Sequence, residues 1–356
     1  METFIFDLDK LLAAGHKVAV ARIIRQKGSA PRAIGTRCII LENGEILGTI
    51  GGGALEYQVI EKARAVHKTG KSVTVHFQLT GEDVAETDML CGGIVDVFLE
   101  PVFPENQVDG DIFGSIRTLM TASNVKAVLL TLIADGIAHN RPDRHALIIQ
   151  DPSGVRIVGR IAGGDSIDME KLLEIKSPEL KRFDAEGVSI FVEPVRAADI
   201  LYIFGAGHIS TFLSPLAKRV GFGVVVIDDR AEFANKKRFP EADEIMVVPL
   251  SQPFNRIVVT PSAYIAIITR GHIYDHAVLK EALKLKPAYI GMVGSRRKRE
   301  LIYQALMKEG ASKETLQKVH SPIGLSIGAE TPEEIAVSIV AELIQERDRL
   351  KKKEAG

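Results

Sequence analysis

Two glycines separated by one residue carry the clearest chemical signal in the chain, in the stretch LYIFGAGHIS at 201–210. Gly205 and Gly207 have no Cβ atom, so they allow a tight turn after the apolar run 201–204. The residues from 210 to 220 then have helical spacing. This order of strand, glycine turn and helix points free backbone N–H groups at a phosphate. We therefore expect a Rossmann-like domain in this part of the chain.

An acid follows these glycines at the distance typical of dinucleotide-binding domains. The strand expected at 224–227 ends in Asp228, where such domains place the carboxylate that binds a ribose hydroxyl. Ser210 replaces the third glycine of the fingerprint. A domain of this fold can also keep its turn without a ligand, so an empty turn is the alternative. The candidate contacts for NAD(P) or another nucleotide are Gly205, Gly207, His208 and Asp228.

Basic residues follow the strand expected at 289–292, in the stretch VGSRRKR at 293–299. Backbone N–H groups at Gly294 and Ser295 and the guanidinium of Arg296 suit a phosphate or pyrophosphate. Cations at a helix start oppose the helix dipole, which favours a bound anion over a merely solvated helix end. We name these three residues as candidate contacts.

A third cluster, RGHIYDH, follows the buried strand expected at 263–269. His272 and His276 have the four-residue spacing of a two-histidine metal site on a helix. No third ligand is evident, and we expect His272 to lie in the turn before the helix. Ligand contact at the sheet edge and simple helix capping are the other interpretations. Arg270 and His272 are the candidates for ligand contact.

In the first half of the chain, Cys91 precedes Gly92 and Gly93. A large ligand can approach such a cysteine closely, and its thiolate is a soft donor for molybdenum, copper or sulfur transfer. A small buried hydrophobic residue is the alternative role. Cys38 lies inside an expected strand and is assigned to the core.

Two further segments of the first half have the composition of an anion-binding site. Ser29 and Arg32 lie in a loop at 27–37 that is rich in Gly, Pro and Ser. Gly52 and Gly53 form a turn that leads directly into a helix. Glu56, in the first turn of that helix, either joins the site or only complements the helix dipole.

The elements that position these residues repeat along the chain. The segment 38–53 resembles 146–164, VFLEPV at 97–102 resembles IFVEPV at 190–195, and 125–133 parallels 18–24. Three matches in the same order predict an internal duplication of strand, hairpin, glycine turn, helix and terminal strand, at about 16–102 and 124–195. The second copy lacks the loop with Ser29 and the Cys-Gly-Gly, so we expect the chemistry in the first copy.

The predicted fold class is therefore α/β, with two domains. The N-terminal α/β domain at 1–197 is built from the duplication, and a Rossmann-like, doubly wound parallel-sheet domain occupies 198–350. A charged tail follows at 351–356. A length of 356 residues is sufficient for a core in each domain.

Composition excludes several classes of function. A formal net charge of −1 gives no electrostatic reason to expect a nucleic-acid partner. No run approaches the roughly 18 apolar residues that a membrane span needs. The two cysteines are too few for a disulfide framework and indicate a reducing compartment. The N-terminus lacks the basic and apolar regions of a signal peptide, so we expect a cytoplasmic protein.

Seven ordered stretches together resemble the XdhC/CoxI family, which comprises accessory proteins of xanthine dehydrogenase and related molybdenum hydroxylases. The resemblance covers most of the chain. It rests on KGSAPRAIGT (27–36), IGGGALE (50–56), CGGIVDVFLEP (91–101), IFGAGHIS (203–210), TRGHIYD (269–275), YIGMVGSRRKR (289–299) and SPIGLSIGAETPEEIAVSI (321–339).

This resemblance implies a maturation role rather than turnover catalysis. Such proteins bind the molybdenum cofactor, as molybdopterin or its cytosine dinucleotide, while a cysteine desulfurase supplies its terminal sulfido ligand. They then pass it to an apo molybdenum hydroxylase. Cys91 matches the Cys-Gly-Gly motif of the family and is expected near the metal. Many members have Cys where this chain has Ala54, so this chain lacks that second thiol.

Two other functions compete with a cofactor chaperone. The fingerprint from Gly205 to Asp228 alone suggests an NAD(P)-dependent oxidoreductase, for which His272 and Asp275 are the candidate hydride-transfer residues. A non-catalytic assembly scaffold is the second alternative. We also expect a homodimer, because small duplicated α/β units leave sheet edges to cover.

Overall fold

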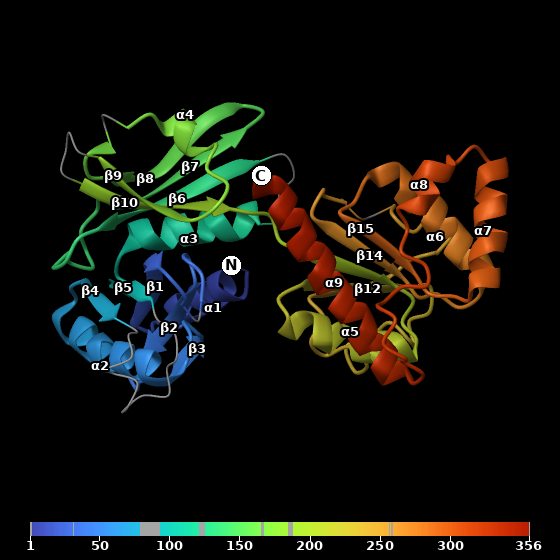
Figure 1. Ribbon diagram of the computed structural model, residues 1–356, viewed down its shortest axis with the longest axis horizontal. Coiled ribbons are helices and arrows are strands. Elements are labelled where there is room, and N and C mark those ends of the chain that lie inside the picture. Colours follow the sequence, from blue (N-terminus) through green and yellow to red (C-terminus); the bar gives the residue numbers. More distant parts are fainter. Residues whose placement is uncertain are drawn as a thin grey trace. The chain divides into compact units, whose positions relative to one another are not determined.

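The computed structural model describes residues 2–30, 32–78, 93–120, 125–164, 167–183, 188–255, 257 and 259–355. The chain divides into two compact units, Met1–Arg196 and Ala197–Gly356 (Figure 1). Among the described residues, none of the helices has the length and apolar character that crossing a membrane requires.

The first unit contains two antiparallel five-stranded sheets with the same strand order, β3-β2-β1-β5-β4 and β8-β7-β6-β10-β9. This identity confirms the predicted duplication. The first sheet consists of β1 (Val18–Lys27), β2 (Arg37–Leu41), β3 (Ile46–Gly48), β4 (Val73–Gln78) and β5 (Ile94–Val102). The second consists of β6 (Lys126–Ile133), β7 (Arg144–Asp151), β8 (Gly154–Ile161), β9 (Glu179–Phe183) and β10 (Val188–Val195).

Each repeat also begins with a helix, which the sequence matches did not include. Helix α1 (Glu2–Ala13) precedes β1, and α3 (Gln107–Leu119) precedes β6. The two copies differ most in the helix after their hairpin. Helix α2 (Gly53–Thr69) packs Leu55, Val59 and Ala63 on one face of the first sheet, whereas its counterpart α4 (Met169–Leu172) is a single turn.

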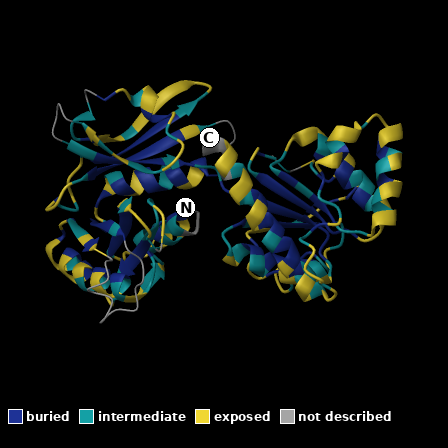
Figure 2. Ribbon diagram, in the orientation of Figure 1, coloured by how far each residue is buried: buried dark blue, intermediate teal, exposed yellow. Residues whose placement is uncertain are grey.

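The second unit is a parallel sheet of order β13-β12-β11-β14-β15 covered by helices on both faces, which confirms the doubly wound fold. Its strands are β11 (Ile200–Phe204), β12 (Gly223–Asp228), β13 (Glu244–Val247), β14 (Ala263–Ile267) and β15 (Tyr289–Met292). Helices α5 (His208–Arg219) and α9 (Pro332–Ala355) pack on one face. Helices α6 (His272–Leu285), α7 (Arg296–Lys308) and α8 (Lys313–Gln317) pack on the other. Buried strands between partly exposed helices are visible in Figure 2.

Two details of the second unit differ from the sequence-based expectations. His272 is the first residue of α6, so its expected place in the preceding turn is wrong. Gly271 has a φ of 82° and makes the turn by itself, so helix α6 begins at the next residue, His272. Helix α9 continues through Ala355, so the stretch expected to form a charged tail is helical up to that residue.

Candidate functional site

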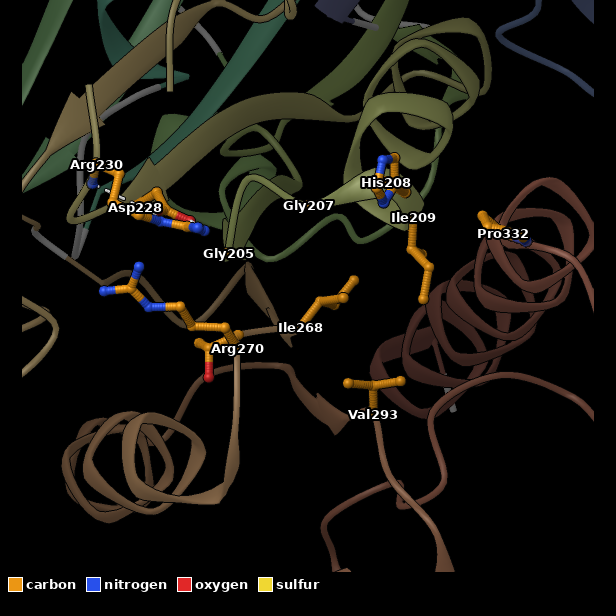
Figure 3. Close-up of a pocket in the computed structure, with 11 residues that line it drawn as sticks. Gly205, Gly207, His208, Ile209, Asp228, Arg230, Ile268, Arg270, Val293 and Pro332 are labelled. Carbon is orange, nitrogen blue, oxygen red and sulfur yellow. Dashed lines mark hydrogen bonds and ion pairs between the residues drawn. The ribbon is translucent and has the colours of Figure 1, made fainter. Parts of the chain in front are cut away.

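A cavity of about 370 Å³ opens at the carboxyl ends of the strands of the second unit (Figure 3). Ligands of doubly wound folds bind at this edge. The lining residues are Gly205, Gly207, His208, Ile209, Asp228, Arg230, Ile268, Thr269, Arg270, Val293 and Pro332. Asp228, Arg230 and Arg270 lie together on one side, and the apolar side chains of Ile209, Ile268 and Val293 lie on the other. The cavity therefore has one charged side and one apolar side.

The glycine turn at this cavity is built by close backbone contact. Gly205 has a φ of +109°, and a Cβ atom there would lie 2.2 Å from the carbonyl oxygen of Ile268. Only glycine fits between the two strands. Ser210 is fully buried and donates its hydroxyl to the Gly205 carbonyl at 2.5 Å. The residue that replaces the third glycine thus fixes the turn with a hydrogen bond.

The carboxylate of Asp228 is already hydrogen-bonded to groups of the protein. Its carboxylate accepts the Ala206 N–H at 2.8 Å and the Arg230 Nε at 2.9 Å and Nη2 at 3.1 Å. Burial opposes the charge, but the Arg230 and Ala206 hydrogen bonds hold the pKa of Asp228 below its ordinary value. A carboxylate has about four lone-pair sites, and these contacts occupy most of them. A ribose hydroxyl would have to displace Arg230.

The other basic residue of the cavity, Arg270, donates to Asp229 at 2.9 Å. His272 is exposed at the start of α6, and His276 instead contacts Glu309, with Nε2 and Oε1 3.1 Å apart. Within the described part of the chain, no group of three His, Cys, Asp or Glu side chains is placed to hold a metal ion.

In the stretch from Gly294 to Lys298, where the sequence predicts phosphate contacts, side chains of the protein itself contact the backbone. Ser295 caps α7 by accepting the Lys298 N–H at 3.3 Å. The stem of Lys298 packs so close to Gly294 that a Cβ atom there would lie 2.9 Å from Lys298 Cδ. The candidate Arg296 and its neighbour Arg297 are exposed at the helix start.

Sequence reasoning missed a buried charge pair beside the cavity. The Lys298 ammonium contacts the carboxylate of Asp275, which is fully buried and also accepts the Thr269 hydroxyl at 2.6 Å. Burial raises the pKa of Asp275 against the opposing effect of Lys298. Asp275 and Lys298 lie in the first turns of α6 and α7, which follow the neighbouring strands β14 and β15, and no pattern in the sequence reveals the pair.

Those candidates of the first unit that the structure describes lie at one end of the first sheet. There β1 ends, β5 begins and β3 runs into the glycines of α2. Gly93 lies against the loop that carries Ser29, since a Cβ atom at Gly93 would be 2.2 Å from the Ser29 carbonyl oxygen. Arg32 is exposed in the same loop. Cys91 and Gly92 lie outside the described residues.

The carboxylate of Glu56 occupies the position that the sequence predicts for a bound anion at the glycine turn. Its carboxylate accepts the N–H groups of Ile50 at 3.0 Å and Gly52 at 2.9 Å, a longer bond from Gly51, and the hydroxyl of Thr49. Burial opposes the charge, but these hydrogen bonds lower the pKa of Glu56. The donors of Gly52 and its neighbours therefore bind a side chain of the protein. Glu56 fixes the turn that positions Ala54 at the start of α2.

Cys38 lies in the core, as predicted from its place in a strand. It is fully buried in β2. Burial and the nearby Glu56 charge raise the pKa of its thiol to about 12, which leaves it an inert hydrophobic residue at neutral pH.

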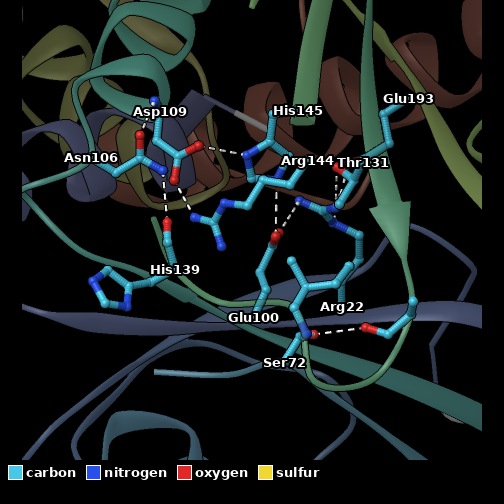
Figure 4. Close-up of polar contacts among 12 residues, drawn as sticks. Arg22, Ser72, Glu100, Asn106, Asp109, Thr131, His139, Arg144, His145 and Glu193 are labelled. Atoms are coloured by element: carbon cyan, nitrogen blue, oxygen red, sulfur yellow. Dashed lines mark hydrogen bonds and ion pairs between the residues drawn. The ribbon is translucent and has the colours of Figure 1, made fainter. Parts of the chain in front are cut away.

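A buried polar cluster joins the two repeats (Figure 4). Arg22 of β1 donates to Thr131 of β6 at 2.9 Å and lies 3.2 Å from Glu193 of β10. Arg37 of β2 also contacts Glu193, at 3.1 Å. Glu193 corresponds to Glu100 in the matched stretches, and Glu100 reaches across to the second repeat in turn. The duplication thus created a reciprocal interface that the sequence pattern did not reveal.

His145 lies at the centre of this cluster and is fully buried. Its Nε2 is 2.9 Å from Glu100 and its Nδ1 is 2.8 Å from Asp109. A neutral imidazole has one donor, so two ionised carboxylates require both nitrogens to be protonated. Burial opposes this charge, yet the two carboxylates raise the pKa of His145. In return, His145 and the nearby arginines hold the pKa of Glu100 at about 2.

Two family models match the chain. The model of the XdhC and CoxI family matches residues 11–78, and the model of the XdhC Rossmann domain matches residues 201–343. The first covers the loop with Ser29 and Arg32 and the glycine turn, and the second covers the whole cavity of the second unit.

Relatives match over nearly the full length. The chain is 27% identical to a Bacillus subtilis protein described as a probable subunit of xanthine dehydrogenase, covering 96% of this chain and 97% of that protein. It is 21% identical to the molybdenum cofactor insertion chaperone PaoD of Escherichia coli, covering 94% and 85%. A crystal structure described as a xanthine dehydrogenase from Bacillus halodurans superposes with a TM-score of 0.76 at 28% identity, covering 97% and 96%.

Proposed function

Because the chain belongs to the XdhC and CoxI family, we propose that it binds the molybdenum cofactor and takes part in the maturation of a molybdenum hydroxylase. The observation that carries this proposal is the gathering of Ser29, Arg32 and Gly93 at one end of the first sheet. These residues come from motifs that only the first repeat has. A relative named as a molybdenum cofactor insertion chaperone supports the same role.

The chemistry of this end suits the proposed ligand. Lys27 and Arg32 are exposed cations there, and cations are the partners that a pterin phosphate requires. The contact of Gly93 with Ser29 leaves no room for a side chain, so the start of β5 is held against the loop that carries these cations. When bound, the cofactor supplies a metal that can carry a terminal sulfur. We propose Cys91 as the thiol beside that metal, with Gly92 as its neighbour.

The glycine turn of α2 has a supporting part in this proposal. Gly52 and Gly53 border the same end of the sheet, and Glu56 holds their backbone in place. Ala54 stands where many family members have Cys, so a single thiol, Cys91, serves the metal in this chain. We propose that the cofactor is held by Cys91 and by backbone and cationic groups.

The cavity of the second unit is proposed as a binding site for a phosphate-bearing ligand. Its proposed contacts are the lining residues Gly205, Gly207, His208, Asp228 and Arg270. The other candidates of this unit, His272, Gly294, Ser295 and Arg296, are not among the residues that line the cavity. The alternative is an NAD(P)-dependent oxidoreductase. The hydrogen bonds from Arg230 to Asp228 argue against it, because they occupy the carboxylate that would bind the ribose. NAD(P)H fluorescence should stay unchanged on mixing with the protein. Saturable quenching would favour the alternative.

We further propose two protein partners and a location. A cysteine desulfurase delivers sulfur to the bound cofactor, and a xanthine dehydrogenase-like apo-hydroxylase receives it. The cytoplasm is the proposed location, because the reduced cysteine that the site needs persists there. A homodimer is expected in light scattering, and a monomer at working concentration would contradict it.

Delivery is tested by reconstitution. The protein loaded with released cofactor should activate an apo molybdenum hydroxylase faster and to a higher final level than the same amount of free cofactor. Equal activation by loaded protein and free cofactor would contradict a chaperone role. The scaffold alternative predicts no retention of cofactor and tolerance of Cys91→Ser.

A further inference from the structure

Helix α9 carries exposed apolar side chains along one face of its first half. Val337 is 50% exposed and Ile344 is 40% exposed. Their spacing places both on one face of the helix, with the half-buried Ala341 between them. Two exposed apolar side chains also occur on α6, at 273 and 285, and on α7, at 301 and 307. Those spacings place the two side chains on different sides of their helix.

This face of α9 lies next to the side that contacts helix α5 (Figure 1). Arg347 is on that side, because its Nη1 donates to the carbonyl of Val220, the residue that caps the end of α5, at 3.0 Å. Val340 is on the same side and packs in the core that α5 and α9 share. Val337 and Ile344 come three residues before Val340 and Arg347, and residues three apart are neighbours on a helix surface.

Helix α5 adds a third exposed apolar side chain, Phe212, which is 37% exposed. Ile209 precedes it by three residues and Leu216 follows it by four, and both pack against the shared core. Phe212 therefore borders that core from the solvent side. The α5–α9 patch consists of Phe212, Val337, Ala341 and Ile344. Single exposed apolar side chains are ordinary, whereas a group of them on two packed helices indicates an interaction surface.

The charges at the two ends of α9 indicate what covers the patch. The first turn is acidic, with Glu333 and Glu334, and the last turn is basic, with Lys352 and Lys353. Lys352 also contacts Asp348 of α9, but this pair is exposed, and such pairs contribute little. A second helix of the same kind that lies antiparallel on the patch therefore places opposite charges together at both ends.

A second copy of this chain supplies that helix by symmetry. A two-fold axis near Ala341 brings Val337 of each copy close to Ile344 of the other, and the acidic end of each α9 close to the basic end of the other. Ala341 has the smallest side chain of the patch, so the two helices can approach closely at the axis. A parallel arrangement would place like charges together, which is unfavourable.

We propose that the α5–α9 patch is the contact surface of a homodimer in which the two copies of α9 run antiparallel. The inference rests on the homodimer of the proposed function, to which it gives a surface and an orientation. All of its residues belong to the second unit, and no step of it involves the molybdenum cofactor. Its test is therefore separate from that of cofactor binding.

Sedimentation equilibrium of the full chain over a range of concentrations tests the surface. Ile344→Glu places a carboxylate of each copy in the apolar contact and should raise the dissociation constant of the dimer by more than about 10-fold. Leu301→Glu, at an exposed apolar position of α7, is the matched control and should leave this constant unchanged. Circular dichroism checks that both variants are folded. An unchanged dissociation constant in folded Ile344→Glu would overturn the proposal.

Charge reversal tests the orientation. One variant combines Glu330→Lys with Glu333→Lys, and the other combines Lys352→Glu with Lys353→Glu; all four positions are exposed. Each variant alone should dimerise more weakly than the wild type, because like charges then meet at both ends. An equimolar mixture should restore dimerisation as a heterodimer, since every end meets its opposite.

Two results of these measurements would contradict the account in different ways. A mixture that associates no better than either variant alone would overturn the antiparallel arrangement. A wild-type protein that stays monomeric at every concentration would overturn the contact surface and the homodimer together. Cofactor retention by that monomer would still leave the maturation role of the proposed function standing.

Discussion

Glu56 binds the backbone of the glycine turn that precedes α2, and its carboxylate accepts several hydrogen bonds at once. Glu56→Gln should lower the free energy of unfolding by about 1–3 kcal/mol at pH 7. Because the folded-state pKa of Glu56 is lowered, its contribution is present above the ordinary carboxyl pKa and is lost as the pH falls through the lowered value. Urea unfolding at pH 7 and at acid pH measures both effects. Glu61→Gln, on the exposed side of α2, is the control and should cost little.

His145 links the two repeats as a buried imidazolium, facing Glu100 of β5 and Asp109 of α3, with Arg144 beside Asp109. His145→Gln should cost about 3–5 kcal/mol at pH 6, since it leaves buried carboxylates without their partner. The folded-state pKa of His145 is raised, so the wild-type advantage is full below the ordinary histidine pKa and shrinks as the pH rises through the raised value.

The pH dependence of unfolding distinguishes this account from a purely steric role for His145. An advantage of the wild type that is constant from pH 6 to alkaline pH would contradict the buried imidazolium. His16→Gln, at an exposed position, should leave the pH profile unchanged.

At the scale of elements, the turn between β11 and α5 contains two glycines with different surroundings, Gly205 and Gly207. Gly205→Ala would drive a Cβ atom into the backbone of Ile268 and should destabilise the second unit by about 3 kcal/mol. Gly207 has a φ of −78° and open space around it, so Gly207→Ala should cost less than about 1 kcal/mol. Equal effects of the two substitutions on urea unfolding would show that the close approach of the strands is not what requires glycine.

The elements could be predicted from the sequence because their signals are local. Buried strands such as 201–204 and the hairpin within 38–53 follow from apolar runs and turn residues, and the repeat of this hairpin at 146–164 indicated the duplication. Helix α3 was missed because no match between the repeats extends over it. The partners of Glu56 and Lys298 could not be predicted, since a glycine turn or a basic helix start looks the same whether its donors bind a ligand or a side chain.

The contact of His76 with Asp96, whose Nδ1 and Oδ1 lie 2.8 Å apart, was not predicted from the sequence for a related reason. The two residues are twenty positions apart and meet only through the register of β4 and β5. No spacing rule connects them. The contacts across the repeats at Arg22 and His145 likewise depend on how two sheets face each other, which short-range patterns do not encode.

At the scale of the whole molecule, each unit has its own hydrophobic core. Residues 197–356 expressed alone should therefore fold, with a cooperative thermal transition and the circular dichroism of a mixed α/β protein. An unfolded fragment would show that the second unit depends on the first for its stability.

The central claim is that this chain carries the molybdenum cofactor. The most direct measurement is the molybdenum and pterin content of the full chain after mixing with released cofactor and removal of the unbound fraction, with Cys91→Ser and Arg296→Ala beside the wild type. We predict stoichiometric retention by the wild type and its loss in Cys91→Ser. Loss of cofactor retention only in Arg296→Ala would place the pterin phosphate in the second unit and would leave Cys91 with a packing role alone. A wild-type protein that retains neither molybdenum nor pterin would contradict the account.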